Sequence, residues 1–164
     1  MTTDQITVQC SCHIELTETV EDYLKTIFAI TSLGAPGSTS RIAARLGVSA
    51  PSVTAMVHRL RDSGLVEQTR WGQVALTEHG QEHARGVVRR HRLLETFLHR
   101  VLGVTWDEVH DEAEVLEHHL SERLEELIDG ALGFPDRDPH GDPIPRPPVK
   151  HEAHGETPLA SSEP

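Results

Sequence analysis

The sequence has few cysteines, no long apolar run and no signal segment, and each of these absences argues against one class of protein. Its 2 cysteines, Cys10 and Cys12, are too close together in the sequence for a disulfide between them to crosslink the fold. No apolar run approaches the roughly 18 residues that a membrane-spanning helix needs. The start, MTTDQITVQCSCHIE, has neither the basic nor the apolar segment of a secretory signal. These absences predict a cytoplasmic protein without a disulfide framework or a membrane partner.

Positive charge is also scarce, and it is unevenly placed. The net charge of −11 argues against a protein that coats nucleic acid along its whole surface. From residue 41 to residue 70, however, 5 arginines outnumber 2 acidic residues, whereas residues 107 to 129 hold 10 acidic residues and a single arginine. Like charge at that density destabilises a compact state unless cations neutralise it. The sequence therefore divides into a basic module and an acidic module.

The amino-terminal half shows the pattern of a helix-turn-helix followed by a β-hairpin. Apolar residues recur with helical spacing after Thr19, the expected N-cap of a first helix. Two short helical segments, STSRIAARL and SAPSVTAMVHRLRDSG, are joined at Gly47, and Ser49 opens the second of them. Residues 65–68 and 73–76 are β-prone runs around a tight turn. A hairpin directly after a recognition-type helix is a wing.

The carboxy-terminal half is predicted to be helical. A long helical pattern runs from Thr77 to about Gly103, a second helix opens at Thr105, and Ser121 caps a third. We expect the second of these helices to bury Leu116 and Leu120, and Leu124 and Leu127 are apolar positions of the third. Prolines concentrate after residue 134, and the tail from about residue 146 lacks any periodicity, as is typical of disorder.

Three residues of the acidic module predict a metal site. Glu114, Glu117 and His118 stand at i, i+3 and i+4, so they project from one face of a helix. Carboxylate oxygens with an imidazole and no thiolate suit Mn²⁺ or Fe²⁺, although Zn²⁺ or Cu²⁺ would still bind by raw affinity. The first helix offers Asp22 as a further ligand. The alternative is a solvated acidic face that carries a surface histidine.

A second set of potential ligands lies nearby. His91 and Glu95 are one helical turn apart, and His110 stands on a neighbouring helical segment. Carboxylates paired with histidines also build di-metal oxidases and hydrolases, so an enzyme is one alternative function. The sequence offers no nucleophile motif and no glycine-rich phosphate loop, which argues against it. A winged-helix regulator with an organic effector is another alternative.

Several motifs occur in one order that resembles a known family. They are VEDYLKTIFAI, IAARLGVSAPSVTAMVHRLRDSGLV, LTEHGQEHA, RRHRLLETFL, VHDEAEVLEHHLS and DPHGDPIP. Together they resemble the metal-dependent repressors typified by the diphtheria toxin repressor and the manganese transport regulator. The resemblance implies a DNA-binding repressor of metal homeostasis genes, with no enzymatic activity and with Fe²⁺ or Mn²⁺ as co-repressor.

The same resemblance implies the domain organisation. The expected fold is mainly α, with a winged helix-turn-helix at residues 17–78 followed by a helical dimerisation and metal-binding domain at residues 79–145. A flexible N-terminus (1–16) and a disordered tail (146–164) flank them. Iron-sensing relatives append an SH3-like domain, for which the chain after Pro145 is too short. The chain therefore resembles the shorter, two-domain form.

The resemblance also assigns the metal ligands. The primary site falls on Asp22, Glu114, Glu117 and His118. Iron-sensing relatives have methionine and cysteine at the positions of Asp22 and Glu114, whereas the manganese-sensing branch has carboxylates, as here. Mn²⁺ is the expected co-repressor, Fe²⁺ is the alternative, and Co²⁺ or Zn²⁺ are expected to bind in vitro.

The second site is assigned by the same comparison. His91, Glu95 and His110 match the ancillary site of the iron-sensing branch. The manganese-sensing branch instead uses His91 with a glutamate at the position of Lys25, a cation that cannot ligate as a carboxylate does. We therefore expect two separated metal sites.

The implied partners are a second copy of the chain and a pseudo-palindromic double-stranded DNA operator. Small polar residues at the start of the recognition helix match the family's base-contact positions, and arginines are expected on phosphates. The predicted DNA-contacting residues are Ser49, Pro51, Ser52, Thr54, Arg41 and Arg70. The alternative for Ser49 and Ser52 is a capping role alone. Metal binding would tie Asp22 to the dimerisation helices and so fix the spacing of the two recognition helices.

Overall fold

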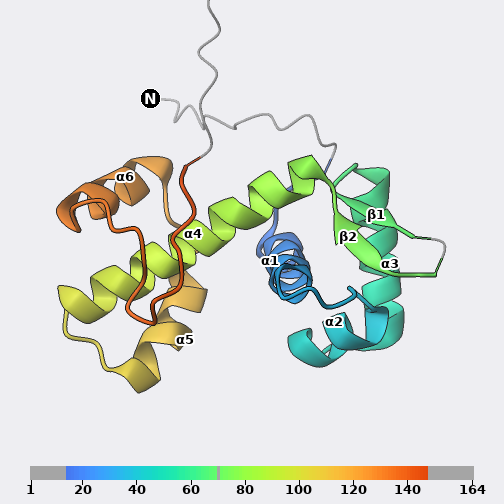
Figure 1. Cartoon of the computed structure of the whole chain (residues 1–164), viewed down its shortest axis with the longest axis horizontal. Helices are drawn as coiled ribbons and strands as arrows, with labels where there is room; N and C mark the ends of the chain where they lie inside the picture. Colours follow the sequence, from blue (N-terminus) through green and yellow to red (C-terminus); the bar gives the residue numbers. More distant parts are fainter. Residues whose placement is uncertain (1–13, 70, 148–164) are drawn as a thin grey trace, which may run out of the picture.

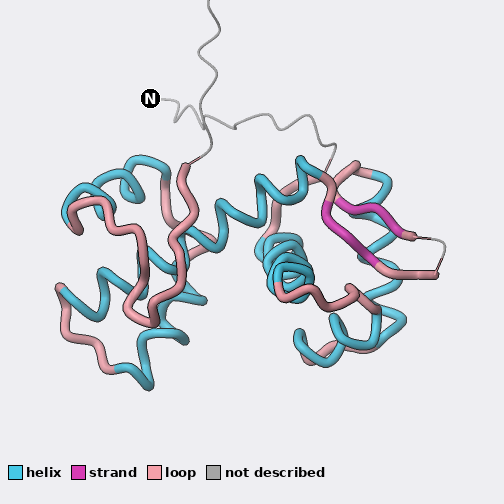
Figure 2. Tube along the Cα trace, in the orientation of Figure 1, coloured by secondary structure: helices cyan, strands magenta, loops and turns pink. Residues whose placement is uncertain are grey.

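The protein is described by a computed structural model that covers residues 14–69 and 71–147 (Figure 1). Its elements are α1 (Glu18–Ser32), α2 (Thr39–Leu46), α3 (Ala50–Asp62), β1 (Val66–Gln68), β2 (Val74–Leu76), α4 (Glu78–Arg100), α5 (Trp106–Leu116) and α6 (Glu122–Ala131). The predicted mainly helical class is confirmed, and helices dominate the trace in Figure 2. Within the described ranges, no helix is long and apolar enough to cross a membrane. Cys10, Cys12, Arg70 and the tail beyond residue 147 lie outside the described residues.

The amino-terminal module is a winged helix-turn-helix, as predicted. Ser49 caps α3, because its side chain accepts a hydrogen bond from the Ser52 N–H, and Gly47 takes the left-handed conformation with φ 68° in the turn. Strands β1 and β2 pair antiparallel, with Val66 opposite Leu76. Gly37 forms an isolated bridge to β2, where any Cβ would lie 2.1 Å from the Val74 carbonyl oxygen.

Helix α1 begins earlier than the sequence predicted. Thr17, and not Thr19, is the N-cap, and its hydroxyl accepts a hydrogen bond from the Val20 N–H. This start places Glu18 and Glu21 in the first turn, where the helix dipole favours negative charge. Asp22 is consequently a helix-interior residue that is not needed for capping.

The long helix α4 joins the two modules (Figure 1). Thr77 caps it as predicted: its hydroxyl accepts from the Gly80 N–H at 3.1 Å and donates to the Gly64 carbonyl at 2.7 Å. Gly80 is required at the crossing with the wing, because a Cβ there would lie 2.0 Å from the Leu65 carbonyl oxygen. The first part of α4 therefore packs against the wing, and the later part of the helix packs against α5 and α6.

The carboxy-terminal module has a thin apolar core, and part of the prediction for it is wrong. Leu116 is 39% exposed, Leu124 and Leu127 are 48% and 51% exposed, and Leu120 is only partly buried. Helix α5 ends at Leu116, but Glu117 keeps a helical conformation and its N–H still bonds the Ala113 carbonyl, so Glu117 shares the buried face of Val109 and Ala113 while Leu116 lies outside that face. The buried set is Leu93, Leu94, Leu98, Val109, Ala113, Ile128 and Ile144.

Candidate metal centre

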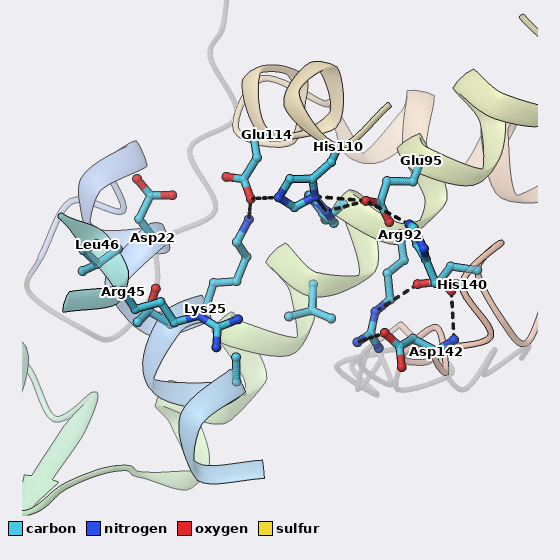
Figure 3. Close-up of a pocket in the computed structure, with 15 residues that line it drawn as sticks. Asp22, Lys25, Arg45, Leu46, Arg92, Glu95, His110, Glu114, His140 and Asp142 are labelled. Atoms are coloured by element: carbon cyan, nitrogen blue, oxygen red, sulfur yellow. Dashed lines mark hydrogen bonds and ion pairs between the residues drawn. The ribbon is translucent and has the colours of Figure 1, made fainter. Parts of the chain in front are cut away.

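Carboxylates and imidazoles from three helices meet beside a cavity of about 610 Å³ (Figure 3). Helix α1 contributes one carboxylate and one lysine, α4 contributes a histidine and a glutamate, and α5 with the turn after it contributes the rest. The residues concerned are Asp22, Lys25, His91, Glu95, His110, Glu114, Glu117 and His118. All seven residues predicted to bind metal therefore lie in one region, where they form two groups.

The first group consists of Asp22, Glu117 and His118. One ligand atom from each lies within 4.8 Å of the other two. The Nε2 atom of His118 is 3.2 Å from Asp22 Oδ1 and 3.5 Å from Glu117 Oε1. Its Nδ1 atom contacts Glu21 Oε2 at 2.6 Å, so Glu21 holds the ring with Nε2 directed at the two carboxylates. Arg90 in turn contacts Glu21 at 2.7 Å.

The second group consists of His91, His110 and Glu114, with Glu95 beside them. The Glu95 Oε1 atom lies 3.0 Å from His91 Nε2 and 3.1 Å from His110 Nδ1. Glu95 is buried, and His140 approaches the same oxygen at 3.8 Å from the loop after α6. The predicted set of His91, Glu95 and His110 therefore lies together, and it remains a prediction as a metal site.

Lys25 lies between the two groups. Its Nζ atom is 2.7 Å from Glu114 Oε1 and 2.7 Å from Glu117 Oε1, and Figure 3 shows the side chain reaching Glu114 from α1. The Oε1 atom of Glu114 is also 3.6 Å from His110 Nε2, and Glu114 belongs to the same ligand group as His110. The structure thus groups three of the four predicted primary ligands and separates Glu114 from them by the Lys25 ammonium.

The acidic side chains are stabilised by these cationic neighbours. Burial alone would raise the pKa of Glu117, but hydrogen bonds from His91 and Lys25 outweigh burial and hold that pKa below its usual range. Burial likewise opposes ionisation of Glu95, yet contacts with His91 and His110 lower its pKa to about 2. Glu117 of the acidic segment is therefore paired with cations from two other helices, Lys25 on α1 and His91 on α4.

The pKa values of His91 and Asp22 are both raised, but for different physical reasons. Burial lowers the pKa of His91, but its hydrogen bonds with Glu117 and Glu95 prevail and raise the pKa to about 9. For Asp22 burial dominates and raises the pKa, although His118 and Lys25 act in the other direction. In the metal-free protein, His91 is consequently a cation at neutral pH.

This donor set fits a divalent cation. Oxygen and imidazole donors of both groups, with no thiolate among the described residues, match the preference of Mn²⁺ and Fe²⁺. Sequence reasoning missed the supporting contacts of Glu21 and Arg90 because they join residues far apart in the chain. It also missed the approach of His140 to Glu95, although His140 lies in the DPHGDPIP motif of the sequence.

Those residues predicted to contact DNA that the structure describes lie at the exposed start of α3 and on α2. Besides capping α3, Ser49 shares a side-chain hydrogen bond of 2.8 Å with Ser52, and the Thr54 hydroxyl donates to the Ala50 carbonyl. Pro51 is in the first turn, and Arg41 is exposed on α2. Capping by Ser49 and access to a DNA groove are compatible, so the DNA contacts remain predictions.

Comparison with known proteins links both modules to one family. The model of the iron dependent repressor N-terminal DNA binding domain matches residues 15–72. The model of the iron dependent repressor metal binding and dimerisation domain matches residues 77–146. The two matches nearly adjoin and together leave only the termini and a short segment of the wing region uncovered.

Individual relatives agree with these matches. The iron-dependent repressor IdeR of Mycobacterium tuberculosis is 40% identical over 131 residues, which are 80% of this chain and 57% of that protein. The diphtheria toxin repressor of Corynebacterium diphtheriae is 37% identical over 131 residues, which are 80% of this chain and 58% of that protein.

Solved structures show the same likeness. A manganese-dependent transcriptional repressor in complex with manganese is 53% identical, with a TM-score of 0.70 over 77% of this chain and 58% of that chain. The chain thus spans less than two thirds of the length of these relatives. Since both modules match models of one family in the order that the fold shows, this chain belongs to the iron-dependent repressor family, which includes manganese-dependent members.

Proposed function

We propose that the protein is a DNA-binding transcriptional repressor activated by Mn²⁺, with Fe²⁺ as the alternative co-repressor, and that it controls metal homeostasis genes. The position of Asp22 is the observation that carries the proposal. Asp22 belongs to α1, whose apolar face packs into the core of the winged helix-turn-helix. Its carboxylate nevertheless lies with Glu117 and His118, which follow α5 in the other module. Ligand binding at this point therefore acts on both modules at once.

The chain's own residues provide the coupling. A bound divalent cation would supply positive charge shared by carboxylates of the two modules. Asp22 would then hold α1 against the end of α5, while Glu21 and Arg90 keep the His118 ring in its orientation. Fixing α1 fixes α2 and α3, because α1 packs against α2 and α2 against α3. A ligand that favours one orientation of the modules shifts the population toward it.

The DNA-facing part of the proposal rests on exposure and charge. We propose that a cytoplasmic homodimer, joined through residues 79–145, presents two copies of α3 to the half-sites of a pseudo-palindromic operator. Small side chains at its start, those of Ser49, Ser52 and Thr54, would allow α3 to approach base edges closely. Pro51 would lie beside them, and Arg41 and Arg70 would contact phosphates.

The choice of metal rests on Asp22 and Glu114. Carboxylates at both positions make the donor set harder than one containing methionine or cysteine, which favours Mn²⁺. The Glu114→Cys variant should therefore shift preference toward Fe²⁺ or Co²⁺. An unchanged order of metals would remove Glu114 from the selectivity ligands. The variant should be compared with the parent in a titration of DNA binding across Mn²⁺, Fe²⁺, Co²⁺ and Zn²⁺.

The decisive experiment measures whether DNA binding requires metal. Operator fragments would be selected from a random DNA pool with Mn²⁺ present, and affinity would be measured with Mn²⁺, without it and after a chelator. We expect Asp22→Ala and Glu117→Ala to lose the metal-dependent gain, which is on the order of 10²-fold for a coupling of about 3 kcal/mol. Glu112→Ala, on the exposed face of α5, is the matched control and should behave as the parent.

Three outcomes would contradict the proposal or one of its parts. Operator binding that resists chelation would favour a winged-helix regulator with a non-metal effector. Unchanged metal dependence in Asp22→Ala and Glu117→Ala would show that these carboxylates are not the metal ligands. Moving the two half-sites apart by half a helical turn should abolish binding by a two-fold dimer, so retained affinity would exclude the pseudo-palindromic arrangement.

A further inference from the structure

Two histidines in the first turns of α4 face each other outside the candidate metal centre. His79 and His83 stand one helical turn apart, and their Nε2 atoms are separated by 3.3 Å. The two rings meet edge to face, with centroids 4.6 Å apart and planes inclined by 74°. Neither residue belongs to the two ligand groups described above. The pair is therefore a separate feature of the helix that joins the two modules.

The separation of the two nitrogen atoms matches that of two ligands on one metal ion. Imidazole nitrogens bind Zn²⁺ at roughly 2.0–2.1 Å in a tetrahedral shell. Two such bonds at the tetrahedral angle place the nitrogens about 3.3–3.4 Å apart. The Nε2 atoms of His79 and His83 already have this separation. Because residues at i and i+4 lie on one face of a helix, both rings can reach one ion by side-chain rotation alone.

The surroundings of the pair favour its metal-binding form. Burial lowers the pKa of His83, and the neighbouring His79 lowers that pKa further. His83 is therefore uncharged at neutral pH, which is the form of imidazole that binds metal. The His79 Nδ1 atom lies 3.7 Å from Glu82 Oε2. A carboxylate on the outer nitrogen of a ligating histidine orients the ring and raises its basicity.

We infer that His79 and His83 form a divalent-metal site that is separate from the candidate metal centre and takes Zn²⁺. Imidazole donors suit Zn²⁺, Cu²⁺ and Ni²⁺, whereas carboxylate-rich groups suit Mn²⁺. The groups of three or more potential ligands among the described residues lie elsewhere, so water completes the shell of the bound ion. Occupation of this site does not depend on the proposed function.

The position of the pair gives a bound ion a structural consequence. Thr77 caps α4, and Gly80 packs against the Leu65 carbonyl at the root of the wing. The first turn of a helix lacks internal partners for its N–H groups and opens more readily than the helix interior. An ion held by His79 and His83 joins the first turn of α4 to the second, so it also stabilises the root of the wing.

The test is a Zn²⁺ titration followed by NMR of the imidazole nitrogens, which reports on each histidine separately. Zn²⁺ should shift the Nε2 resonances of His79 and His83 together and with one apparent affinity. His79→Gln should weaken the response of His83 by more than about tenfold, and His83→Gln should do the same to His79. His58→Gln, which alters an exposed histidine of α3, is the control and should leave both responses unchanged.

Two results of this titration would overturn the inference. One is a pair of Nε2 resonances that respond to Zn²⁺ with different affinities in the parent. The other is a His83 that keeps the affinity of the parent in His79→Gln. The His79 side chain is 35% exposed, so this variant should fold, and its circular dichroism should match that of the parent.

Hydrogen exchange measures the structural consequence. At a free Zn²⁺ concentration about ten times the dissociation constant, the amide protons of residues 78–83 should exchange roughly tenfold more slowly in the parent. The same protons in His79→Gln should show no such protection. Zn²⁺ bound at the candidate metal centre is common to both proteins, so the difference between them isolates the pair. Equal protection by Zn²⁺ in the parent and His79→Gln would overturn the inference.

Discussion

The two modules are held together by different forces. The amino-terminal module encloses a buried apolar cluster of 14 residues, whereas the cluster of the carboxy-terminal module has 7. The smaller core is supplemented by buried charge: Arg89 is 5% exposed and contacts Glu125 at 2.7 Å and Asp129 at 2.6 Å. Apolar packing maintains one shape under most ionic conditions, while charge pairs depend on the cations present. The module that relies on charge is thus the one able to respond to an ion.

Breaking the charge network should give the largest loss of stability. Arg89→Met leaves Glu125 and Asp129 without their cation and removes the contact with the Pro145 carbonyl. We expect the free energy of unfolding of the carboxy-terminal module to fall by about 3–5 kcal/mol, measured by urea denaturation. Arg59→Met, on the exposed face of α3, is the control and should change it by less than about 0.5 kcal/mol. Similar effects of both substitutions would mean that the network contributes nothing to stability.

Removing apolar volume from the other module should have a slightly smaller effect that ions do not influence. Leu24 is fully buried on α1, and Leu24→Ala should lower the free energy of unfolding by about 3 kcal/mol. We expect the same loss at low and high salt, because no charged partner is involved. A loss that varied with salt by more than about 1 kcal/mol would contradict the proposed difference between the modules.

The pH dependence of the metal-free protein should give the smallest effect and the most specific one. The pKa of His91 is raised to about 9 in the folded protein from 6.5, so the protonated ring stabilises the fold. This contribution is complete below about pH 6.5 and is lost as pH rises through about 9. Across that interval stability should fall by on the order of 1–3 kcal/mol in the parent.

His91→Gln provides the comparison for this pH effect. The variant lacks the titrating ring, so thermal melts from pH 6 to pH 9.5 should give a flatter profile. The apolar variant Leu24→Ala should keep the slope of the parent. A parent profile that is flat over this interval would show that the ion pair of His91 with Glu117 and Glu95 does not form in solution.

Local signals explain which features the sequence predicted correctly. The caps Ser49, Thr77 and Ser121 were predictable because each hydroxyl binds an N–H three residues away. The start of α1 was wrong because Thr17 and Thr19 both offer a capping hydroxyl. Burial of Leu116 was wrong because the buried face of α5 runs through Val109, Ala113 and Glu117, so a charged residue takes the buried position that an apolar pattern assigns to a leucine.

The sequence by itself determined the helices, the wing and the kinds of donor atoms in the acidic module, because periodicity and capping act between neighbours in the chain. Only the tertiary structure decided how the donor residues are divided into two ligand groups. Lys25 meets Glu114 and Glu117 across 89 and 92 residues, and Glu21 meets His118 across 97. Such contacts depend on how α1 packs against α4 and where α5 ends, which no local pattern specifies. The physical reason is that charge pairing depends on distance in space, whereas helical spacing depends on distance along the chain.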